Sequence, residues 1–250
     1  MHDARALLGV IAFFPQGVDE NNLDWLFPTI PNGIDIIDKF CILSLTYRNN
    51  GFITMLAPLR DYLSPKDPKS PSLLCTTRER YFTRMSVNID PDKPNLGETR
   101  WIKSEDVNVE HLLDIFTTID PNSNNVWNAC TYFMQHLYWH KNRLVILKPK
   151  IEGLPDDYRF KSDCLLELSQ LYDSIGNQAE RKRLLTYALK LYRGREDDQV
   201  PVAQILKDLS DTNRQMDFPK EGTQQAEESL KRCERFGDTM GQADCLIKLG

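Results

Sequence analysis

The chain has 250 residues, of which 41% are hydrophobic and 10% aromatic, enough apolar side chain to build the core of one or two domains. Its 36 acidic residues outnumber the 31 basic residues and give a net charge of -5, which disfavours non-specific attraction to nucleic acid or to an anionic membrane surface. The cysteines lie far apart and form no C-x-x-C pair, so we expect reduced, buried thiols and an intracellular, cytoplasmic location. They are Cys41, Cys75, Cys130, Cys164, Cys233 and Cys245.

The longest apolar stretch, residues 6–14, is far shorter than the roughly 20 residues that span a bilayer. It follows Arg5, as the apolar part of a signal peptide follows a basic residue, but no small-residue cleavage pattern comes after Phe14. We therefore expect no membrane span and interpret residues 4–14 as a buried helix that ends before Pro15.

Two more helices and a hairpin are expected before residue 64. Asp19 is a typical N-cap for a helix over residues 20–27, and residues 34–41 carry apolar side chains at helical spacing. Runs rich in β-branched and aromatic residues at 42–47 and 52–56 flank Asn50-Gly51, a pair that favours a tight hairpin turn. Three helices and a hairpin make residues 4–63 a predicted winged-helix domain.

The remainder of the chain is predicted to be α-helical. Residues 64–103 are a proline-rich linker with one amphipathic helix at 72–86, and residues 104–160 are a helical linker or capping region. The fold class is therefore mainly α, with the small winged-helix unit followed by helical repeats. The charged runs at 76–80 and 181–183 are expected on solvated helix faces.

An internal repeat occupies residues 161–250. Leu165, Leu168, Ser169, Tyr172, Gly176 and Ala188 of one copy are matched 41 positions later by Leu206, Leu209, Ser210, Asn213, Asp217 and Ser229. A third copy begins with Leu246, Leu249 and Gly250. Large residues three apart, followed by a small one, allow two helices of a hairpin to pack closely. The pattern resembles the tetratricopeptide repeat (TPR), although Asn213 and Ser229 replace an aromatic residue and an alanine. Because the third copy lacks its second helix, we expect a chain truncated at its C-terminus.

The front of the chain resembles the winged-helix module that follows the nucleotide-binding core in STAND ATPases, in particular fungal NACHT/NB-ARC proteins with C-terminal TPRs. Residues 6–17, 23–28 and 52–63 carry this resemblance. In that family a Met-His-Asp-type motif contacts ADP through its histidine. Here Leu56 of Met55-Leu56-Ala57 stands at the histidine position, and a leucine has no hydrogen-bond donor for phosphate.

No catalytic or cofactor site is expected. The sequence contains neither G-x-x-x-x-G-K-[ST] nor G-x-G-x-x-G, the loops that cradle phosphates. His136 and His140 have the spacing of two metal ligands on a helix, but no third ligand is identifiable, so we assign no metal. Six cysteines and four histidines carry no local signature of nucleophilic catalysis.

We interpret the chain as a non-catalytic regulatory or sensor fragment of a STAND-type signalling ATPase. The resemblance of the chain to that family implies an upstream NTPase core in a full-length protein. Its repeats are expected to bind a polar protein or peptide ligand on a concave face. The residues assigned to this face are Gln170, Asp173, Lys207, Asp211 and Arg214.

Two alternatives remain. One is a stand-alone TPR adaptor or scaffold without an attached ATPase. The other is a winged-helix DNA-binding regulator, which is disfavoured because the candidate recognition helix carries Asp35 and Asp38 against a single Lys39 and the wing offers only Arg48.

Overall fold

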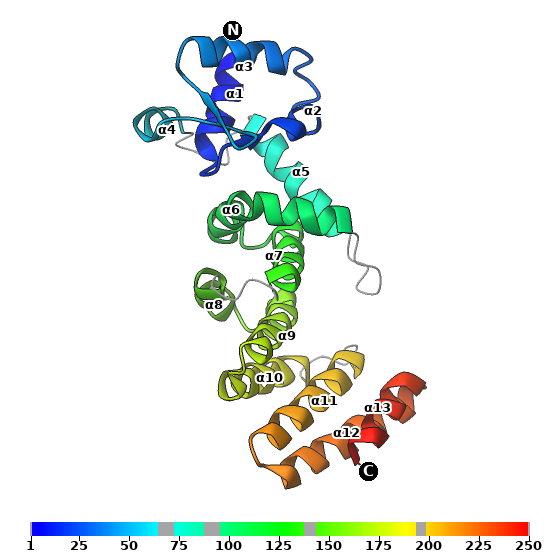
Figure 1. Cartoon of the computed structure of the whole chain (residues 1–250). Coiled ribbons are helices and arrows are strands. Elements are labelled where there is room, and N and C mark those ends of the chain that lie inside the picture. Colours follow the sequence, from blue (N-terminus) through cyan, green and yellow to red (C-terminus); the bar gives the residue numbers. More distant parts are fainter. Residues whose placement is uncertain (1, 65–72, 88–95, 138–143, 194–198, 250) are drawn as a thin grey trace. The chain divides into compact units, whose positions relative to one another are not determined.

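The computed structural model describes residues 2–64, 73–87, 96–137, 144–193 and 199–249 (Figure 1). The chain is mainly α-helical and contains a small three-stranded sheet. It divides into two compact units, Met1–Phe133 and Met134–Gly250, which are described separately.

The first unit begins with α1 (His2–Phe13), the helix expected at residues 4–14. Leu7, Val10 and Ile11 are almost fully buried on one side of this helix, and Phe14 is buried directly after it. This is the amphipathic spacing of a helix that packs on a core, so the interpretation of the apolar stretch as a buried helix is confirmed.

The helix expected at residues 20–27 forms in two pieces, the 3-10 helix η1 (Glu20–Asn22) and α2 (Leu23–Leu26). Asp19 caps the first piece as expected, because its Oδ1 accepts the backbone N–H of Asn21 at 2.9 Å. The division falls at Asn22, whose side-chain amide donates to Glu105. The third helix, α3 (Gly33–Ile42), buries Ile37 and Phe40.

The three strands are β1 (Val18–Asp19), β2 (Tyr47–Asn49) and β3 (Phe52–Thr54), antiparallel in the order β1-β3-β2. Asn50 and Gly51 both have positive φ, 49° and 82°, which confirms the predicted hairpin turn. The expectation of a strand from residue 42 is wrong, since α3 continues to Ile42. The chain reverses at Ser44, which also has positive φ, before the strand starts.

The helices that complete the first unit are α4 (Ala57–Leu63), α5 (Leu73–Val87), α6 (Leu96–Ile119) and the start of α7 (Asn124–Leu137). The helix expected at 72–86 is α5. The stretch 64–103 holds more than the one helix expected, because α6 begins at Leu96. In the sequence, Pro94 shortly precedes this start, and a proline there is compatible with a helix N-terminus as well as with a linker.

A buried polar cluster joins four segments of the first unit. Glu105 of α6 is fully buried, and its carboxylate accepts hydrogen bonds from Tyr81 (2.8 Å), Asn22 (2.9 Å) and Asn108 (2.8 Å). Asn108 also donates to the carbonyl of Gly17 at 2.8 Å. Burial raises the pKa of Glu105, while these three donors act in the opposite direction.

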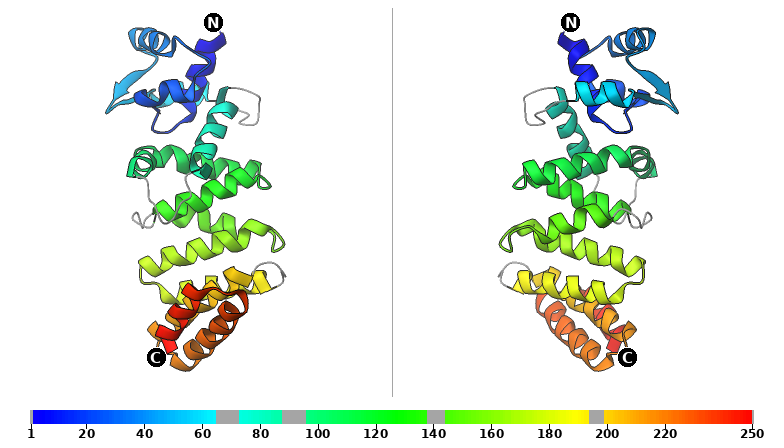
Figure 2. Two further views of the ribbon diagram at one scale, coloured as in Figure 1. Left: turned by 90° about the vertical axis from the view of Figure 1, so that its right-hand side faces the viewer. Right: turned by 90° about the vertical axis from the view of Figure 1, so that its left-hand side faces the viewer.

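The second unit contains α8 (Leu144–Glu152), α9 (Arg159–Ser174), α10 (Gln178–Arg193), α11 (Gln199–Gln215), α12 (Pro219–Phe236) and α13 (Thr239–Leu249). Helices α9 and α10 form one hairpin, α11 and α12 a second, and α13 packs on α12 (Figure 2). This helical arrangement fits the TPR-like pattern of the sequence.

The structural equivalence of the two hairpins extends to their turns. Leu165 and Leu206 are buried, as are the other paired positions Leu168 and Leu209, Ser169 and Ser210, and Ala188 and Ser229. Gly176 and its counterpart Asp217 both have left-handed φ, 76° and 63°. The polar replacements in the second copy have partners, since Asn213 donates to Gln225 at 2.6 Å and Ser229 to the Ala203 carbonyl at 2.8 Å.

The expectation that all six cysteines are buried is met by only four of them. Cys130, Cys164, Cys233 and Cys245 are buried, whereas Cys41 and Cys75 are partly exposed. None of these described cysteines forms a disulfide bond. Among the residues that the structure describes, no helix combines the length and the apolar character needed to cross a membrane.

Candidate partner-binding face of the helical repeats

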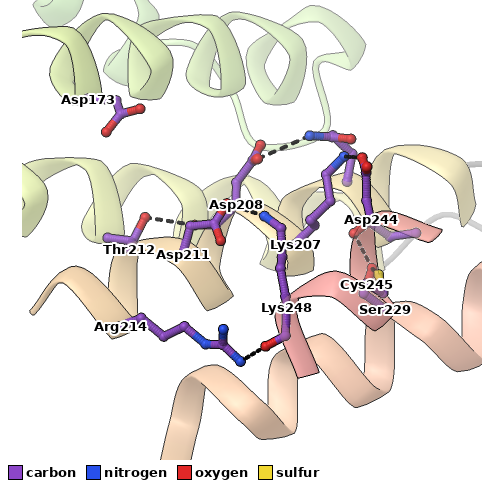
Figure 3. Close-up of polar contacts among 12 residues, drawn as sticks. Asp173, Lys207, Asp208, Asp211, Thr212, Arg214, Ser229, Asp244, Cys245 and Lys248 are labelled. Atoms are coloured by element: carbon purple, nitrogen blue, oxygen red, sulfur yellow. Dashed lines mark hydrogen bonds and ion pairs between the residues drawn. The ribbon is translucent and has the colours of Figure 1, made fainter. Parts of the chain in front are cut away.

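The residues assigned to the binding face lie on α9 and α11, the first helices of the two hairpins. Gln170 is exposed on α9. The polar groups of α11 lie next to α13, the first helix of the third copy, as Figure 3 shows for Lys207, Asp211 and Arg214. The structure therefore places these three residues where successive first helices meet.

Lys207 is tied to the next repeat. Its Nζ lies 2.9 Å from Oδ2 of Asp244 on α13, and its side chain is 18% exposed. Burial alone would lower the pKa of Lys207, but the hydrogen bond to Asp244 and the attraction of Asp244 and Asp208 outweigh it and raise the pKa. The same hydrogen bond lowers the pKa of the Asp244 carboxyl.

In a second ion pair between the same two helices, α11 supplies the carboxylate and α13 supplies the base. Asp211 on α11 pairs with Lys248 on α13, at the same sequence separation of 37 that relates Lys207 to Asp244. Arg214 donates from Nη2 to the backbone carbonyl of Lys248. A shift of α13 along α11 would bring like charges together, so the two pairs favour one register between these helices.

On α9, Asp173 is held by the second helix of its own hairpin. It accepts hydrogen bonds from Arg181 Nη1 at 2.8 Å and Gln178 Nε2 at 2.9 Å. Arg181 is buried, so the expectation that the run 181–183 is wholly solvated is wrong at this residue. A buried arginine is tolerated here because its charge is compensated by Asp173.

The expectation for the run 76–80 needs the same kind of correction. Thr77 of α5 is fully buried, and its hydroxyl donates to the carbonyl of Leu73 at 2.7 Å. The hydroxyl thus has a partner one turn earlier, which removes the cost of burying it.

Asp208 is a member of the face that sequence reasoning missed. Its carboxyl accepts a hydrogen bond from Gln204 at 3.0 Å, and its pKa is raised by burial, against the opposing effects of Gln204 and of the Arg181 and Lys207 charges. The burial that raises this pKa comes from packing between helices, and no sequence signal marks the position.

Three ion-paired carboxylates at this face are more exposed than two of the bases beside them. The side chains of Asp244, Asp173 and Asp211 are 48%, 40% and 33% exposed, whereas those of Arg181 and Lys207 are 8% and 18% exposed. Arg214, another base of the face, is exposed, so the surface presents it beside these carboxylates. Carboxylate oxygens retain free lone pairs after accepting one hydrogen bond, so this surface accepts further donors.

The sequence also drew attention to Leu56, His136 and His140, which are not among the residues of this face. Leu56, at the expected histidine position, is exposed and directly precedes α4. His140 lies outside the described residues, as does the side chain of His136, so the pair is not tested. In the described parts of the chain, no group of three or more His, Cys, Asp or Glu side chains is placed to hold a metal ion.

The chain was compared with known proteins. No family model matches it, and no curated protein matches it. Among solved structures, the chain is similar to a signal transduction ATPase with numerous domains (STAND) protein with a tetratricopeptide repeat sensor from Pyrococcus horikoshii, with 12% sequence identity and a TM-score of 0.29. The match covers 99% of this chain and 46% of that protein, so the chain spans less than half of its length. A likeness of this size carries no argument about function.

Proposed function

We propose that this chain is a regulatory or sensor portion of a STAND-type signalling ATPase and acts by recognising a protein or peptide partner rather than by catalysis. One observation carries the proposal: a compact α1-β1-α2-α3-β2-β3 unit and two equivalent helical hairpins occur in one chain. The first arrangement supports the interpretation as a winged helix, and the second supports TPR-like repeats. In the full-length protein, partner binding to the repeats acts on an upstream nucleotide-binding core.

The ligand is a polar peptide or protein segment that carries basic side chains. This choice follows from the exposed carboxylates of Asp173, Asp211 and Asp244, which lie on successive first helices. Lysine and arginine donors form charge-assisted hydrogen bonds with such oxygens. Repeats of this kind present their first helices to ligands along one continuous surface.

A DNA-binding role fits the structure less well. The exposed surface of α3 carries Asp35 and Asp38, and Arg48 of the hairpin is held by Glu20 (2.8 Å) and Asp38 (2.6 Å). The hydrogen bonds that Arg48 donates, first to Asp38 and then to Glu20, raise the pKa of Arg48. A wing arginine engaged by two carboxylates is not available to a phosphate.

Photo-crosslinking tests the proposed face. A photoreactive amino acid replaces the exposed Gln170 on α9, and a matched variant carries it at the exposed Lys231 on α12. We expect one protein from the source cell to crosslink through position 170 and not through position 231. Identical crosslinking patterns from the two positions would contradict the assignment of the first-helix face.

A second experiment, which uses the captured partner, distinguishes the proposed sensor function from the stand-alone adaptor. If the captured partner, added to the full-length protein encoded by the same transcript, changes nucleotide exchange, the sensor role is supported. A transcript that encodes no P-loop core would support the adaptor instead.

A further inference from the structure

Two buried thiols, Cys233 and Cys245, face each other between α12 and α13, which pack directly on one another. The Sγ of Cys245 on α13 donates to the Oγ of Ser229 on α12 at 3.3 Å (Figure 3). Ser229 lies one turn before Cys233 on the same helix. Burial raises the pKa of the Cys233 thiol, the neighbouring Cys245 thiol raises it further, and a hydrogen bond with Ser229 opposes both effects. The two thiols therefore share one hydroxyl group and act on each other.

A glycine of α13 makes room for this arrangement. A Cβ on Gly241 would lie 2.7 Å from the Sγ of Cys233, so a side chain at position 241 would displace the thiol. Gly241 lies one turn before Cys245. Because helical side chains tilt toward the helix N-terminus, Cys245 is directed back toward the turn that carries Gly241. The space above Gly241 thus lies between the two sulfur atoms.

The packing of the repeats does not itself require thiols at these positions. Forty-one residues earlier, the corresponding positions of α10 and α11 are Tyr192 and Gln204. Tyr192 is buried, as Cys233 is, so the same kind of helix junction forms with side chains that have no redox chemistry. The two cysteines are therefore a property of the α12–α13 junction and not of the repeat pattern.

We propose that Cys233 and Cys245 form a redox modification site, at which a disulfide bond covalently joins α12 to α13. Both thiols are free in the structure, and disulfides that form in reducing compartments are usually transient and regulatory. The bond restrains α13, whose Asp244 pairs with Lys207 on α11. The redox state of the site therefore sets how firmly α13 is held beside α11, whichever ligand the charged face binds.

Oxidised glutathione is the class of oxidant that fits this site. Cys233 is 4% exposed and Cys245 0%, so the first step falls on Cys233. Its sulfur loses a proton and attacks one sulfur of oxidised glutathione, and one glutathione leaves and takes up the proton. Cys245 then attacks the Cys233 sulfur of the mixed disulfide and releases the second glutathione in the same way. Two protein thiols are oxidised to one disulfide, and one oxidised glutathione is reduced to two thiols.

Peptide mapping detects the bond directly. The full 250-residue chain is incubated under native, anaerobic conditions in buffers of reduced and oxidised glutathione until the products no longer change, then alkylated in acid-quenched samples and digested with trypsin. Long incubation is needed because the thiolate is the nucleophile and the raised pKa of Cys233 keeps it protonated. Cleavage after Arg232, Arg235 and Lys248 places the two thiols on separate peptides, 233–235 and 236–248.

We expect these two peptides to appear as one linked species whose amount rises with the proportion of oxidised glutathione and which dithiothreitol removes. The control Cys41→Ser, at a partly exposed cysteine, leaves the linked species unchanged. Cys233→Ser and Cys245→Ser each abolish it. Far-UV circular dichroism of the two variants separates a lost bond from a lost fold.

Hydrogen exchange of residues 239–249 tests the effect on α13. We expect amides of α13 to exchange at least about tenfold more slowly in the oxidised wild type than in the reduced wild type, and Cys233→Ser to show no such difference. Two results would overturn the proposal. One is the absence of the linked species at every glutathione ratio while Cys41 forms a mixed disulfide, which shows that the oxidant is active. The other is a linked species without any change in the exchange of α13.

Discussion

Lys207 and Asp244 connect the first helices of consecutive repeats through an ion pair of 2.9 Å. Lys207 belongs to the face assigned to a ligand, so a substitution there affects both recognition and the packing of α13. A variant that changes both Lys207 and Arg214 to Glu would lose contacts to Asp244 and to the Lys248 carbonyl, and reduced partner binding would then have two causes.

Reversal of the ion pair separates these causes. We expect Lys207→Glu to lower the melting temperature, because the introduced carboxylate would face Asp244, and the double variant Lys207→Glu with Asp244→Lys to recover most of the loss. Gln170→Glu, on an exposed residue of the same face, is the control and should leave the melting temperature unchanged. A double variant no more stable than Lys207→Glu would show that the pair does not hold α13 in register.

The buried carboxyl of Glu105 predicts a pH dependence of stability. Its pKa is raised in the folded state, chiefly by burial, so the folded protein retains the proton to a higher pH than the unfolded chain. The unfolded state then binds fewer protons, and the contribution of Glu105 to the free energy of unfolding falls as the pH rises from about 4.3 through the raised value.

Urea denaturation at several pH values, on wild type and Glu105→Gln, measures this contribution. The difference in unfolding free energy between the two proteins should change in favour of Glu105→Gln with rising pH, because the amide does not ionise. Carboxylates with lowered pKa, such as Glu180 at about 2, affect both proteins alike and cancel in the difference. A difference that is independent of pH would contradict the burial of an ionisable carboxyl at this site.

Gly17 is required by the sheet. It has φ of 86°, and a Cβ there would collide with the carbonyl of Ile53 on the neighbouring strand. We expect Gly17→Ala to destabilise the protein by about 2–4 kcal/mol, from left-handed strain together with the steric clash. Gly33→Ala, where a Cβ meets nothing within 4 Å and φ is ordinary, should be nearly neutral by the same chemical denaturation. Equal losses in the two variants would argue against the described position of β1 beside β3.

The turns of the two hairpins allow a reciprocal exchange. Asp217 has the left-handed φ that its counterpart Gly176 also adopts, and a Cβ on Gly176 meets no atom within 4 Å. Asp217→Gly should therefore stabilise the protein by about 0.5–1 kcal/mol, and Gly176→Asp should destabilise it by a similar amount. Calorimetry on both variants checks the equivalence of the repeats, and changes of the same sign would refute it.

Local signals in the sequence predicted much of the fold. The cap at Asp19 and the Asn50-Gly51 turn each depend on near neighbours, so they could be recognised without a structure. The repeat that pairs Leu165 with Leu206 could be recognised because the same local pattern of residues recurs. Strand β1 could not, because two residues carry no period and its pairing partner Ile53 is distant in sequence.

The candidate face was predicted less completely, because its charges are set by contacts between helices. The burial of Arg181 depends on Asp173, and the accessibility of Lys207 depends on Asp244. Hydrophobic spacing indicates which residues lie between the packing positions. It does not indicate which of them are already paired with the next helix.

The affinity of the crosslinked partner for the charge-reversed double variant tests the central claim most directly. Lys207→Glu with Asp244→Lys keeps the ion pair but moves the exposed carboxylate from α13 to α11. If the repeats bind a basic partner through this face, titration calorimetry should show weaker binding to the double variant at a melting temperature near that of wild type. Unchanged affinity in a protein of unchanged stability would contradict recognition through the first helices of the repeats.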